Sequence, residues 1–389
     1  MIKAIKIKLY PTKEQESMLW KTANHARGAW NVGLGYIKDE YEKGNSVSTA
    51  QARQMITDAK KSNKDYLWLG EISADAWRNV FQDMTKAFKV FRENLKKGIP
   101  FPDAGYPQFK KKSKSKPSFY HDERKLKVYG NKVYLEKIGF VKMKDEGRLP
   151  QGNYKKDRIK VSNVRVGYDN KNWYLTCGIE TPEEYWTPNQ DLSIGIDLGI
   201  KELAVTNVEG LSFDNINKKR EVKRLEKKHR RMSHKISRKY EANKDGKKFV
   251  KTHNILKLER LRKRVDRRLT NIRDNHLHQA TKTIIKQKPS KIVVEDLNVK
   301  GMMKNKHLAK LVANQKFFEF RRQLEYKAKF YLGIDVTVAD RWFPSSKMCS
   351  CCGQIKSDLK LKDRVYRCDC GLKIDRDLNA SINLANYSI

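Results

Sequence analysis

The chain has 389 residues, a length that suits two or three domains. Hydrophobic residues make up 39% and aromatic residues 10%, which is enough for packed cores and excludes wholesale disorder. Lysine and arginine total 84 against 45 acidic residues, a formal net charge of +39. This charge predicts a polyanionic partner, usually nucleic acid, with an anionic membrane surface as the alternative. No apolar run approaches the about 20 residues needed to cross a bilayer, and "MIKAIKIKLYPTKEQ" is no signal peptide. We therefore expect a cytoplasmic, nucleic-acid-facing protein with no membrane association.

The N-terminal part predicts a small antiparallel sheet. "IKAIKIKLY" (2–10) alternates apolar and basic residues, as a strand with one charged face does. Thr12 and Gln15 fit a capping box that starts a helix. "LKVYGNKVYL" (126–135) and "VRVGYDNKNWYLTCGI" (164–179) are typical of hairpins that turn at Gly130-Asn131 and Asp169-Asn170. Together these strands could close a small barrel that is interrupted by the helices of residues 12–97.

A strongly amphipathic helix is predicted from Ser73 to Lys97. Its apolar positions recur at spacings of three and four: Trp77, Phe81, Met84, Phe88, Phe91 and Leu95. Beside them lies a polar stripe of Arg78, Gln82 and Lys86, which is either a solvated face or a DNA contact. The following segment, residues 98–119, is a Gly/Pro-punctuated basic linker that includes Lys110, Lys111 and Lys112. These lysines are either solvated or in contact with phosphate.

A linker at 181–190 leads into the C-terminal half, which contains a very basic segment. Residues 218–274 hold 24 lysines and arginines against 7 acids, an excess of 17. The apolar spacing predicts two helices joined by "EANKDGKK" (241–248), and the mutual repulsion of so many cations favours an anionic ligand over a merely solvated face. The candidate nucleic-acid contacts on this pair are Arg224, Arg230, Arg231, Arg262, Arg264 and Arg267.

Three carboxylates stand at the ends of predicted elements. Apolar strand-like runs lead to Asp197 and to Glu295. A helix bearing Leu308, Leu311, Phe318, Leu324 and Tyr331 and a third strand, "GIDVTVAD" (333–340), follow. A final helix presents Leu378, Ile382 and Ala385 as its apolar face and carries Asp377 on its first turn. Strand–Asp, strand–Glu and helix–Asp is the order of an RNase H-like nuclease, in which the acids hold two Mg²⁺ or Mn²⁺ ions around the scissile phosphate.

The cysteines are clustered near the C-terminus. Cys349-x₂-Cys352-x₁₅-Cys368-x-Cys370 resembles a zinc ribbon, although one residue instead of two separates the second pair. The glycine after Cys352 favours Cys349 and Cys352 over Cys351 as ligands. Free, reduced cysteines are the alternative to a zinc site, and Cys177 is predicted to be a core residue.

The chain resembles the TnpB (OrfB) family of transposon-encoded RNA-guided nucleases, relatives of the compact type V CRISPR effectors. The matching segments cover nearly the whole chain in order: "KLYPTKEQE", "GYPQFKKK", "GIDLGIKELAV", "VVEDLNVKGM", "CSCCG" and "CGLKIDRDLNASINL". The resemblance implies an α+β multidomain fold. It comprises a wedge-type β-barrel (1–11 and 120–185), an inserted helical recognition lobe with a basic linker (12–119), an RNase H-like RuvC α/β domain (186–344 and 373–389, with the basic helical pair at 215–285) and an inserted zinc ribbon (345–372).

The resemblance also implies roles for single residues. The family's catalytic acids fall on Asp197, Glu295 and Asp377, and Asp375 becomes a helix cap beside the supporting Arg376. The partners would be a guide RNA from the transposon end and target double-stranded DNA, cut next to a short adjacent motif. The cofactors would be Mg²⁺ or Mn²⁺, with Zn²⁺ in the ribbon. A separately encoded transposase acting on the same element and a prokaryotic, nucleoid-associated location complete this expectation.

Three rival functions remain open from the sequence. One is a nuclease-silent RNA-guided repressor, which the complete set of acids disfavours. The second is a DNA-joining transposase, which also uses RNase H-like acids. The third is a basic RNA-binding protein whose acids are structural, and it predicts that loss of Asp197 leaves nucleic-acid handling unchanged.

Overall fold

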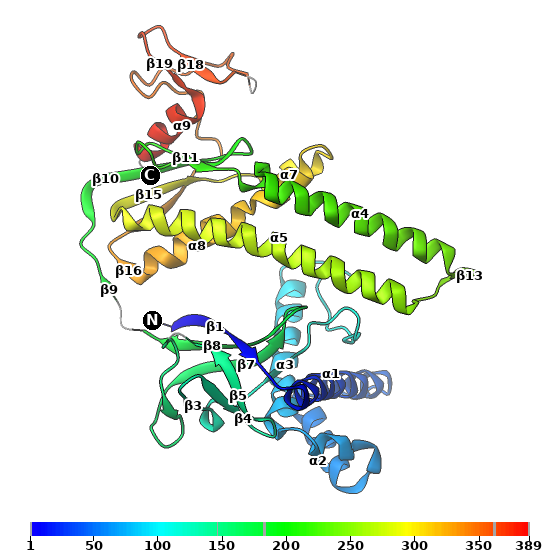
Figure 1. Ribbon diagram of the computed structural model, residues 1–389. Helices are drawn as coiled ribbons and strands as arrows, with labels where there is room; N and C mark the ends of the chain where they lie inside the picture. The colour runs from blue at the N-terminus through cyan, green and yellow to red at the C-terminus, as the bar shows by residue number, and fades with distance from the viewer. Residues whose placement is uncertain (1, 146, 182–183, 361–362, 388–389) are drawn as a thin grey trace. The chain divides into compact units, whose positions relative to one another are not determined.

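The computed structural model describes residues 2–145, 147–181, 184–360 and 363–387, and the chain divides into two compact units (Figure 1). The first unit is Met1–Thr181 and the second is Pro182–Ile389. The predicted linker at 181–190 spans this division, with residues 182 and 183 outside the described part. The finer domain boundaries stay predictions. Within the described ranges, no helix is long and apolar enough to cross a membrane.

The first unit combines a sheet with long helices. Its elements are β1 (Ile2–Tyr10), α1 (Lys13–Glu42), α2 (Thr49–Ser62), a 3-10 turn (Lys64–Gly70), α3 (Ala74–Lys96), β2 (Ser118–Tyr120), a second 3-10 turn (Glu123–Lys125), β3 (Lys127–Tyr129), β4 (Lys132–Leu135), β5 (Gly139–Lys144), β6 (Gly152–Asn153), β7 (Val161–Tyr168) and β8 (Trp173–Glu180).

The sheet of the first unit is antiparallel and has the strand order β2-β7-β8-β1-β5-β4-β3-β6. Both predicted hairpins are present, because Tyr129 pairs with Lys132 and Tyr168 pairs with Trp173. The alternation of β1 buries Ile7 and Leu9 and leaves its lysines outward. Among the described residues, β2 and β6 form no ladder with each other, so closure into a barrel stays a prediction.

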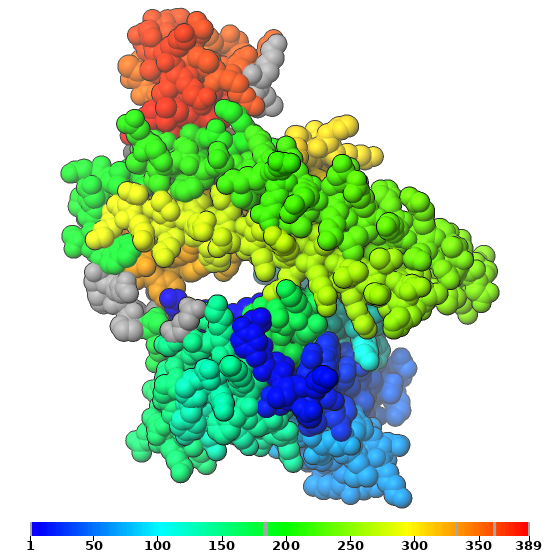
Figure 2. Space-filling model, in the orientation of Figure 1, coloured from blue at the N-terminus to red at the C-terminus, as the bar shows by residue number. Residues whose placement is uncertain are grey.

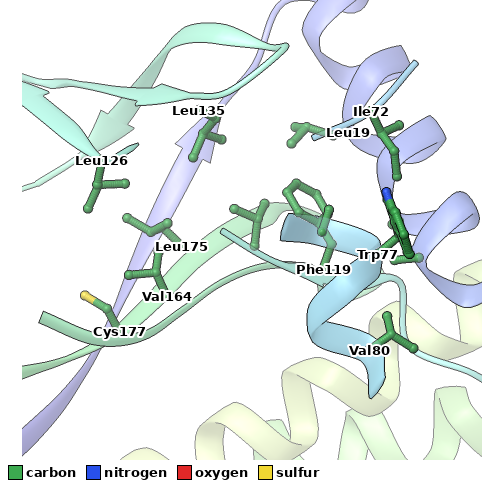
Figure 3. Packing of buried hydrophobic residues seen from close by; sticks show 14 of the residues in the cluster. Leu19, Ile72, Trp77, Val80, Phe119, Leu126, Leu135, Val164, Leu175 and Cys177 are labelled. Carbon is green, nitrogen blue, oxygen red and sulfur yellow. The ribbon is translucent and has the colours of Figure 1, made fainter. Parts of the chain in front are cut away.

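The helices of the first unit begin where the sequence predicts. Thr12 and Gln15 form the capping box of α1, and α3 runs between Ser73 and Lys97 as its caps. Four of the six predicted seam positions are buried, whereas Phe88 is half-buried and Leu95 is exposed. Figure 3 shows part of the core, in which Leu19 and Trp77 from helices meet Phe119, Leu135 and Leu175 from strands or their edges.

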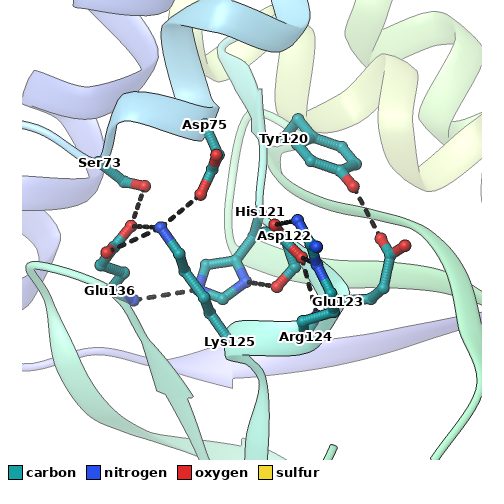
Figure 4. Close-up of polar contacts among 9 residues, drawn as sticks. All are labelled: Ser73, Asp75, Tyr120, His121, Asp122, Glu123, Arg124, Lys125 and Glu136. Atoms are coloured by element: carbon teal, nitrogen blue, oxygen red, sulfur yellow. Dashed lines mark hydrogen bonds and ion pairs between the residues drawn. The ribbon is translucent and has the colours of Figure 1, made fainter. Parts of the chain in front are cut away.

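A polar network lies inside the first unit, between the start of α3 and the sheet (Figure 4). Lys125 Nζ lies 2.9 Å from Glu136 Oε1 and 2.6 Å from Asp75 Oδ2, while the Ser73 hydroxyl donates to Glu136. The buried His121 accepts at Nε2 from the Glu136 backbone N–H (3.0 Å), so its Nδ1 carries the proton toward the Asp122 carbonyl (2.9 Å). Burial lowers the pKa of His121, and the network holds this residue neutral.

The second unit contains a five-stranded sheet, several helices and a small C-terminal ribbon. Its elements are β9 (Glu184–Tyr185), β10 (Asn189–Leu198), β11 (Glu202–Thr206), β12 (Phe213–Asp214), a 3-10 turn (Ile216–Lys218), α4 (Arg220–Ala242), β13 (Lys244–Asp245), β14 (Lys248–Phe249), α5 (His253–Lys286), β15 (Pro289–Glu295), α6 (Val299–Lys304), α7 (Ala309–Gln315), α8 (Phe317–Phe330), β16 (Tyr331–Leu332), β17 (Asp335–Ala339), β18 (Val365–Arg367), β19 (Lys373–Asp375) and α9 (Arg376–Ala385).

The five-stranded sheet has the order β12-β11-β10-β15-β17, with β10, β15 and β17 parallel to one another. Because side chains alternate along a strand, its two faces carry different residues. Ile194, Ile196, Ile292 and Val294 pack in one core with residues of α5 and α8, whereas Val293 packs with Leu384 of α9. The sheet therefore lies between α5 and α8 on one face and α9 on the other.

The basic segment forms the two predicted helices, α4 and α5, which lie antiparallel beside each other (Figure 1). A narrow apolar core of Val222, Leu225, Val265 and Leu269 joins them. The small β13–β14 hairpin lies at the predicted connecting stretch "EANKDGKK". The sequence did not predict this hairpin.

Two predicted helices differ in the structure. The helix expected to carry Leu308 to Tyr331 is broken into α7 and α8 at Lys316, whose backbone is left-handed (φ 57°, ψ 44°). The prediction of one helix that bears Leu308 to Tyr331 is therefore wrong, and Leu308, Leu311 and Phe318 are exposed. The apolar face predicted for the last helix is also wrong in part, because Leu378 and Ile382 are half-buried while the polar Asn379, Ser381 and Asn383 are buried.

Candidate active site

Asp197 and Glu295 come from neighbouring parallel strands. Ile196 of β10 is in register with Val294 of β15, so the next residue of each strand lies beside that of the other. Adjacent strands are about 4.8 Å apart. Asp197 and Glu295 follow the same alternation as Gly195 and Val293, and both therefore project from the sheet face that α9 covers.

Helix α9 brings the third carboxylate to the same face. Asp377 lies on the first turn of α9. The backbone of this helix packs directly against the backbone of β10 at Gly195. A Cβ atom at Gly195 would lie 2.0 Å from the Ser381 carbonyl oxygen and 2.3 Å from the Ala385 backbone nitrogen. Ser193 Oγ also donates to the Ala385 carbonyl (2.7 Å). The absence of a side chain at 195 thus permits the contact between helix and strand that carries Asp377 to the other two acids.

The electrostatics show that the three carboxylates act on one another. Burial, followed by repulsion from Glu295 and Asp377, raises the pKa of Asp197 well above its usual value. Burial also raises the pKa of Glu295, although hydrogen bonds from Ser345 and Asp197 and the charge of Arg376 oppose this rise. Such clusters of acids with perturbed pKa values are typical of functional sites, because a structural role gives no reason to bring like charges together.

A serine and two arginines contact the three carboxylates. The buried Ser345 donates its hydroxyl to Glu295 Oε1 (2.7 Å), and sequence reasoning missed this residue. Arg364 Nη1 and Arg376 Nε lie 3.8 and 3.7 Å from the Asp377 carboxylate. The contact of Arg376 with Asp377 agrees with the supporting role predicted for Arg376. No local pattern in the sequence indicates that Ser345 and Arg364 come close to the acids from other segments.

Asp375 is the N-cap of α9, as predicted. Its Oδ1 accepts from the backbone N–H groups of Asp377 (2.9 Å) and Leu378 (3.3 Å). Since its carboxylate is engaged in starting the helix, Asp375 fixes the position of Asp377. The two neighbouring aspartates therefore have different environments.

The four predicted zinc ligands are brought together. The sulfur atoms of Cys349, Cys352, Cys368 and Cys370 all lie within 4.8 Å of one another, and the group excludes Cys351 among the described residues. A zinc ion with sulfur ligands at about 2.3 Å requires sulfur atoms about 3.8 Å apart. The Cys349–Cys370 and Cys352–Cys368 pairs are at 3.6 and 3.5 Å, so the donor set fits zinc despite the short second knuckle.

The four clustered thiols differ in their pKa values: burial and hydrogen bonds with neighbouring sulfurs raise those of Cys352, Cys368 and Cys370, whereas the pKa of Cys349 is lowered. Burial raises the pKa of Cys349, but hydrogen bonds from the backbone N–H groups of Cys352 and Cys351 and from neighbouring sulfurs outweigh it and bring the pKa to about 7. The isolated Cys177 behaves differently, since burial raises its pKa to about 11 in the core of the first unit, as expected for a core residue.

Buried asparagines of α9 hold the base of the ribbon. Asn379 accepts from the Ser350 N–H (3.0 Å) and donates to the Met348 carbonyl (2.7 Å). Asn383 donates to the carbonyls of Ser345 and Met348 (both 2.7 Å). These bonds explain why polar side chains occupy the buried face of α9, where the sequence predicted an apolar one.

The predicted nucleic-acid residues of the basic pair are largely exposed. Acidic side chains of α4 form ion pairs with arginines of α5, namely Arg268–Glu221 (2.5 Å) and Arg273–Glu226 (2.7 Å). The pair forms the green to yellow-green surface on the right of Figure 2, and many other lysines and arginines on its flanks are exposed. Of the candidate contacts, the exposed ones are Arg224, Arg230, Arg231 and Arg264, whereas the half-buried ones are Arg262 and Arg267.

In the first unit the candidate contacts fall into two groups. Arg78, Gln82 and Lys86 form an exposed stripe on α3, and Lys111 and Lys112 are exposed as well. Lys110 differs because it is half-buried against α1. Its backbone N–H donates to Asn31 (2.7 Å) and its ammonium lies 3.6 Å from the centre of the Trp30 ring.

Three family models match successive parts of the chain. Residues 1–46 match a helix-turn-helix domain of the OrfB/IS605 type, residues 176–306 match an OrfB/IS605 "Probable transposase" model, and residues 317–384 match the TNB domain of Cas12f1-like proteins. The last two ranges contain all three acids and the four clustered cysteines.

Relatives extend over almost the whole chain. A protein of Streptomyces pristinaespiralis named "Putative RNA-guided DNA endonuclease" is 30% identical, over 98% of this chain and 88% of its own length. InsQ of Escherichia coli (strain K12), of the same description, is 25% identical over 98% of this chain and 91% of its own. A solved Cas12f1–sgRNA–target DNA complex has a similar fold, with a TM-score of 0.50 and 14% identity over 99% of both chains. The chain therefore belongs to the TnpB (OrfB) family, as do these two relatives named "Putative RNA-guided DNA endonuclease".

Proposed function

We propose that this chain is an RNA-guided DNA endonuclease of a transposable element. It binds a guide RNA from the transposon end and cuts target double-stranded DNA next to a short adjacent motif. The observation that carries the proposal is the gathering of Asp197, Glu295 and Asp377 on one sheet face in a chain of net charge +39. The names of the relatives and the fold of the solved complex support it.

In this proposal the second unit is a RuvC-type nuclease domain. Asp197, Glu295 and Asp377 offer hard oxygen ligands, the donors that Mg²⁺ and Mn²⁺ prefer. When bound, a pair of such ions activates water and stabilises the leaving oxygen of the scissile phosphate. Ser345 holds the Glu295 carboxylate in one orientation through its 2.7 Å hydrogen bond. Arg364 and Arg376 reduce the mutual repulsion of the acids.

The ribbon has a structural part in this function. Cys349, Cys352, Cys368 and Cys370 would hold Zn²⁺, whose contribution is to fold a segment too short for a hydrophobic core of its own. Asn379 and Asn383 connect the base of that segment to the helix bearing Asp377. A zinc-folded ribbon would thereby hold Ser345 and Arg364 beside the carboxylates.

Nucleic-acid binding is assigned to the basic surfaces. The exposed arginines of α4 and α5 would contact phosphates of guide and target, and the stripe Arg78, Gln82 and Lys86 would contact the DNA beside the target. Base pairing with the guide supplies the sequence specificity, because phosphate contacts carry none. The proposal also includes a prokaryotic cytoplasmic location and a separately encoded transposase that acts on the same element.

The test is a cleavage assay with the co-purified RNA. The chain is expressed with its flanking DNA, the bound RNA is sequenced, and a plasmid with a matching target and randomised flanks is offered in Mg²⁺. We expect cleavage beside one short motif. Loss of an outer-shell partner of a metal typically reduces activity about 10- to 100-fold. Asp197→Asn should reduce cleavage by more than this and should retain RNA binding.

Asp191→Asn provides a matched control, because Asp191 is an exposed residue of the same strand, β10. It should cleave like the wild type. Target binding without any cleavage by the wild type would instead indicate an RNA-guided repressor. Joining of transposon ends that resists RNase treatment would indicate a transposase.

A further inference from the structure

Trp342 is an aromatic side chain that belongs to none of the apolar cores formed by the described residues of its unit. It follows β17 and is 85% exposed, the highest value among the large hydrophobic residues that the structure describes. Its neighbour Phe343 packs against Tyr387 with the ring centres 4.9 Å apart. Of these two adjacent aromatic residues, Phe343 is explained by packing inside the unit, whereas the exposed Trp342 is not.

The loop that carries Trp342 is fixed by hydrogen bonds. The Trp342 backbone N–H donates to the Asp340 carboxylate (2.8 Å), and the Asp340 N–H donates to the Tyr387 hydroxyl (3.2 Å). The Ser345 N–H donates to the Phe343 carbonyl (2.8 Å). The exposure of the indole thus results from a defined backbone conformation, and a fixed aromatic surface loses little conformational entropy when it binds a partner.

Both ends of this loop are attached to the carboxylate cluster. On one side of Trp342, Arg341 forms an ion pair with Asp296, the residue after Glu295. On the other side, Ser345 donates to Glu295 itself (2.7 Å). Three residues span at most about 11 Å of extended chain. The Cα atom of Trp342 is therefore at most about 11 Å from that of Ser345, whose hydroxyl contacts Glu295.

An unpaired nucleobase is the ligand that suits this position. The faces of bases inside a duplex are covered by their neighbours, whereas a base in a single strand offers a free face that stacks on aromatic side chains. The acids beside the loop would repel phosphates unless metal ions are bound, so a sequence-tolerant stacking contact is a means of holding the strand there. Arg341 is engaged with Asp296 and does not compete for that face.

We propose that Trp342 is a positioning residue that stacks on an unpaired base of the DNA strand, next to the phosphate being cut. This inference rests on the proposed nuclease function. It adds to that function a specific contact for the strand, made by a residue that holds neither a metal nor the guide.

The experiment combines a protein change with a DNA change. Trp342→Ala and Trp342→Phe are compared with the wild type on targets that carry one abasic nucleotide at each position around the cut. Trp342→Ala should slow cleavage of the intact target by about 5- to 150-fold, the range expected for one base–aromatic stack, and Trp342→Phe should recover most of the rate. The wild type should be slowed similarly by an abasic nucleotide at one or two positions, where Trp342→Ala shows no further loss. Binding of guide and target should not change.

Phe318→Ala is the matched control, since it removes another exposed aromatic side chain, from α8. It should have no effect. Equal rates for Trp342→Ala and wild type, or an abasic effect that persists undiminished in Trp342→Ala, would overturn the inference while leaving the nuclease function intact. Loss of target binding, or conversion of a wild-type dimer to a monomer by Trp342→Ala, would assign the indole to another partner. A wild type that never cleaves would remove the proposed function and this inference together.

Discussion

Gly195 sets how closely α9 can approach β10, and its replacement by alanine tests whether that approach forms the active site. The new Cβ would lie 2.0 Å from the Ser381 carbonyl oxygen, 2.3 Å from the Ala385 nitrogen and 2.9 Å from the Leu384 carbonyl carbon. All three are backbone atoms, so no side chain can rotate away. Ordinary contact begins at 3.4 Å, and α9 must therefore move from the strand by about 1.4 Å.

This displacement has two measurable consequences. Overpacking of a core typically costs about 1–3 kcal/mol, which lowers the melting temperature of a unit of this size by about 2–4 °C per kcal/mol. Because Asp377 moves with α9, the three acids also lose their mutual geometry. A misplacement of about 1 Å can reduce a reaction rate about 100-fold, so cleavage should fall by at least this factor while guide binding is retained.

The assay measures single-turnover cleavage of a guide-matched target, together with thermal unfolding and RNA affinity. Gly35→Ala is the control, since a Cβ there would have only Phe109 Cε1 within 4 Å, at 3.9 Å, and α1 would gain about 0.5–1 kcal/mol of helix stability. Cleavage by Gly195→Ala at the wild-type rate, with unchanged melting temperature, would refute the reasoning. Retained far-ultraviolet circular dichroism would distinguish a displaced helix from an unfolded unit.

Two other changes test the ribbon and the polar network. Cys352→Ser should reduce bound zinc from about one ion per chain to near zero, whereas Cys351→Ser should leave it unchanged, because only Cys352 belongs to the four-sulfur group; equal zinc content in the two variants would contradict the assignment. Burial lowers the pKa of His121, although the charges of Glu136, Asp122 and Asp75 oppose this shift; Lys125 lies in the same network. As the pH falls, His121 is therefore protonated in the unfolded state at a higher pH than in the folded state. Its contribution to stability is complete above the unfolded pKa of 6.5 and is lost as the pH falls below it. Thermal unfolding at pH 7.5 and 5.0 should therefore show a larger loss for the wild type than for His121→Gln, and identical losses would exclude His121 as the titrating group.

Local patterns predicted the regular elements well where the deciding interactions lie close in sequence. The capping box at Thr12, the helix between Ser73 and Lys97 and the turn at Gly130-Asn131 depend on neighbours a few residues away, and the structure has each of them. The break at Lys316 was missed because a lysine in left-handed conformation gives no signal comparable to glycine or proline. Its position is fixed by partners from elsewhere, including the ion pair with Asp274.

The buried face of α9 illustrates a second limit of sequence reasoning. A helical pattern of Leu378, Ile382 and Ala385 indicated an apolar face. Asn379 and Asn383 are nevertheless buried, and their amides donate to the backbone carbonyl groups of residues 345 and 348. The rule that buried residues are apolar fails where a loop without regular structure packs on a helix, since its backbone must still form hydrogen bonds.

By itself the sequence determined the types of residue and their order along the chain. These include the acids at element ends, the clustered cysteines, the basic helical pair and a net charge that predicts a polyanionic partner. The tertiary structure alone decided which of them meet. The alternation of β10 and β15 directs Asp197 and Glu295 to one face, and Gly195 lets α9 deliver Asp377 there. Ser345, Arg364 and Trp342 reach the same place through a loop and a ribbon whose paths depend on contacts between distant segments, and no local pattern contains that information.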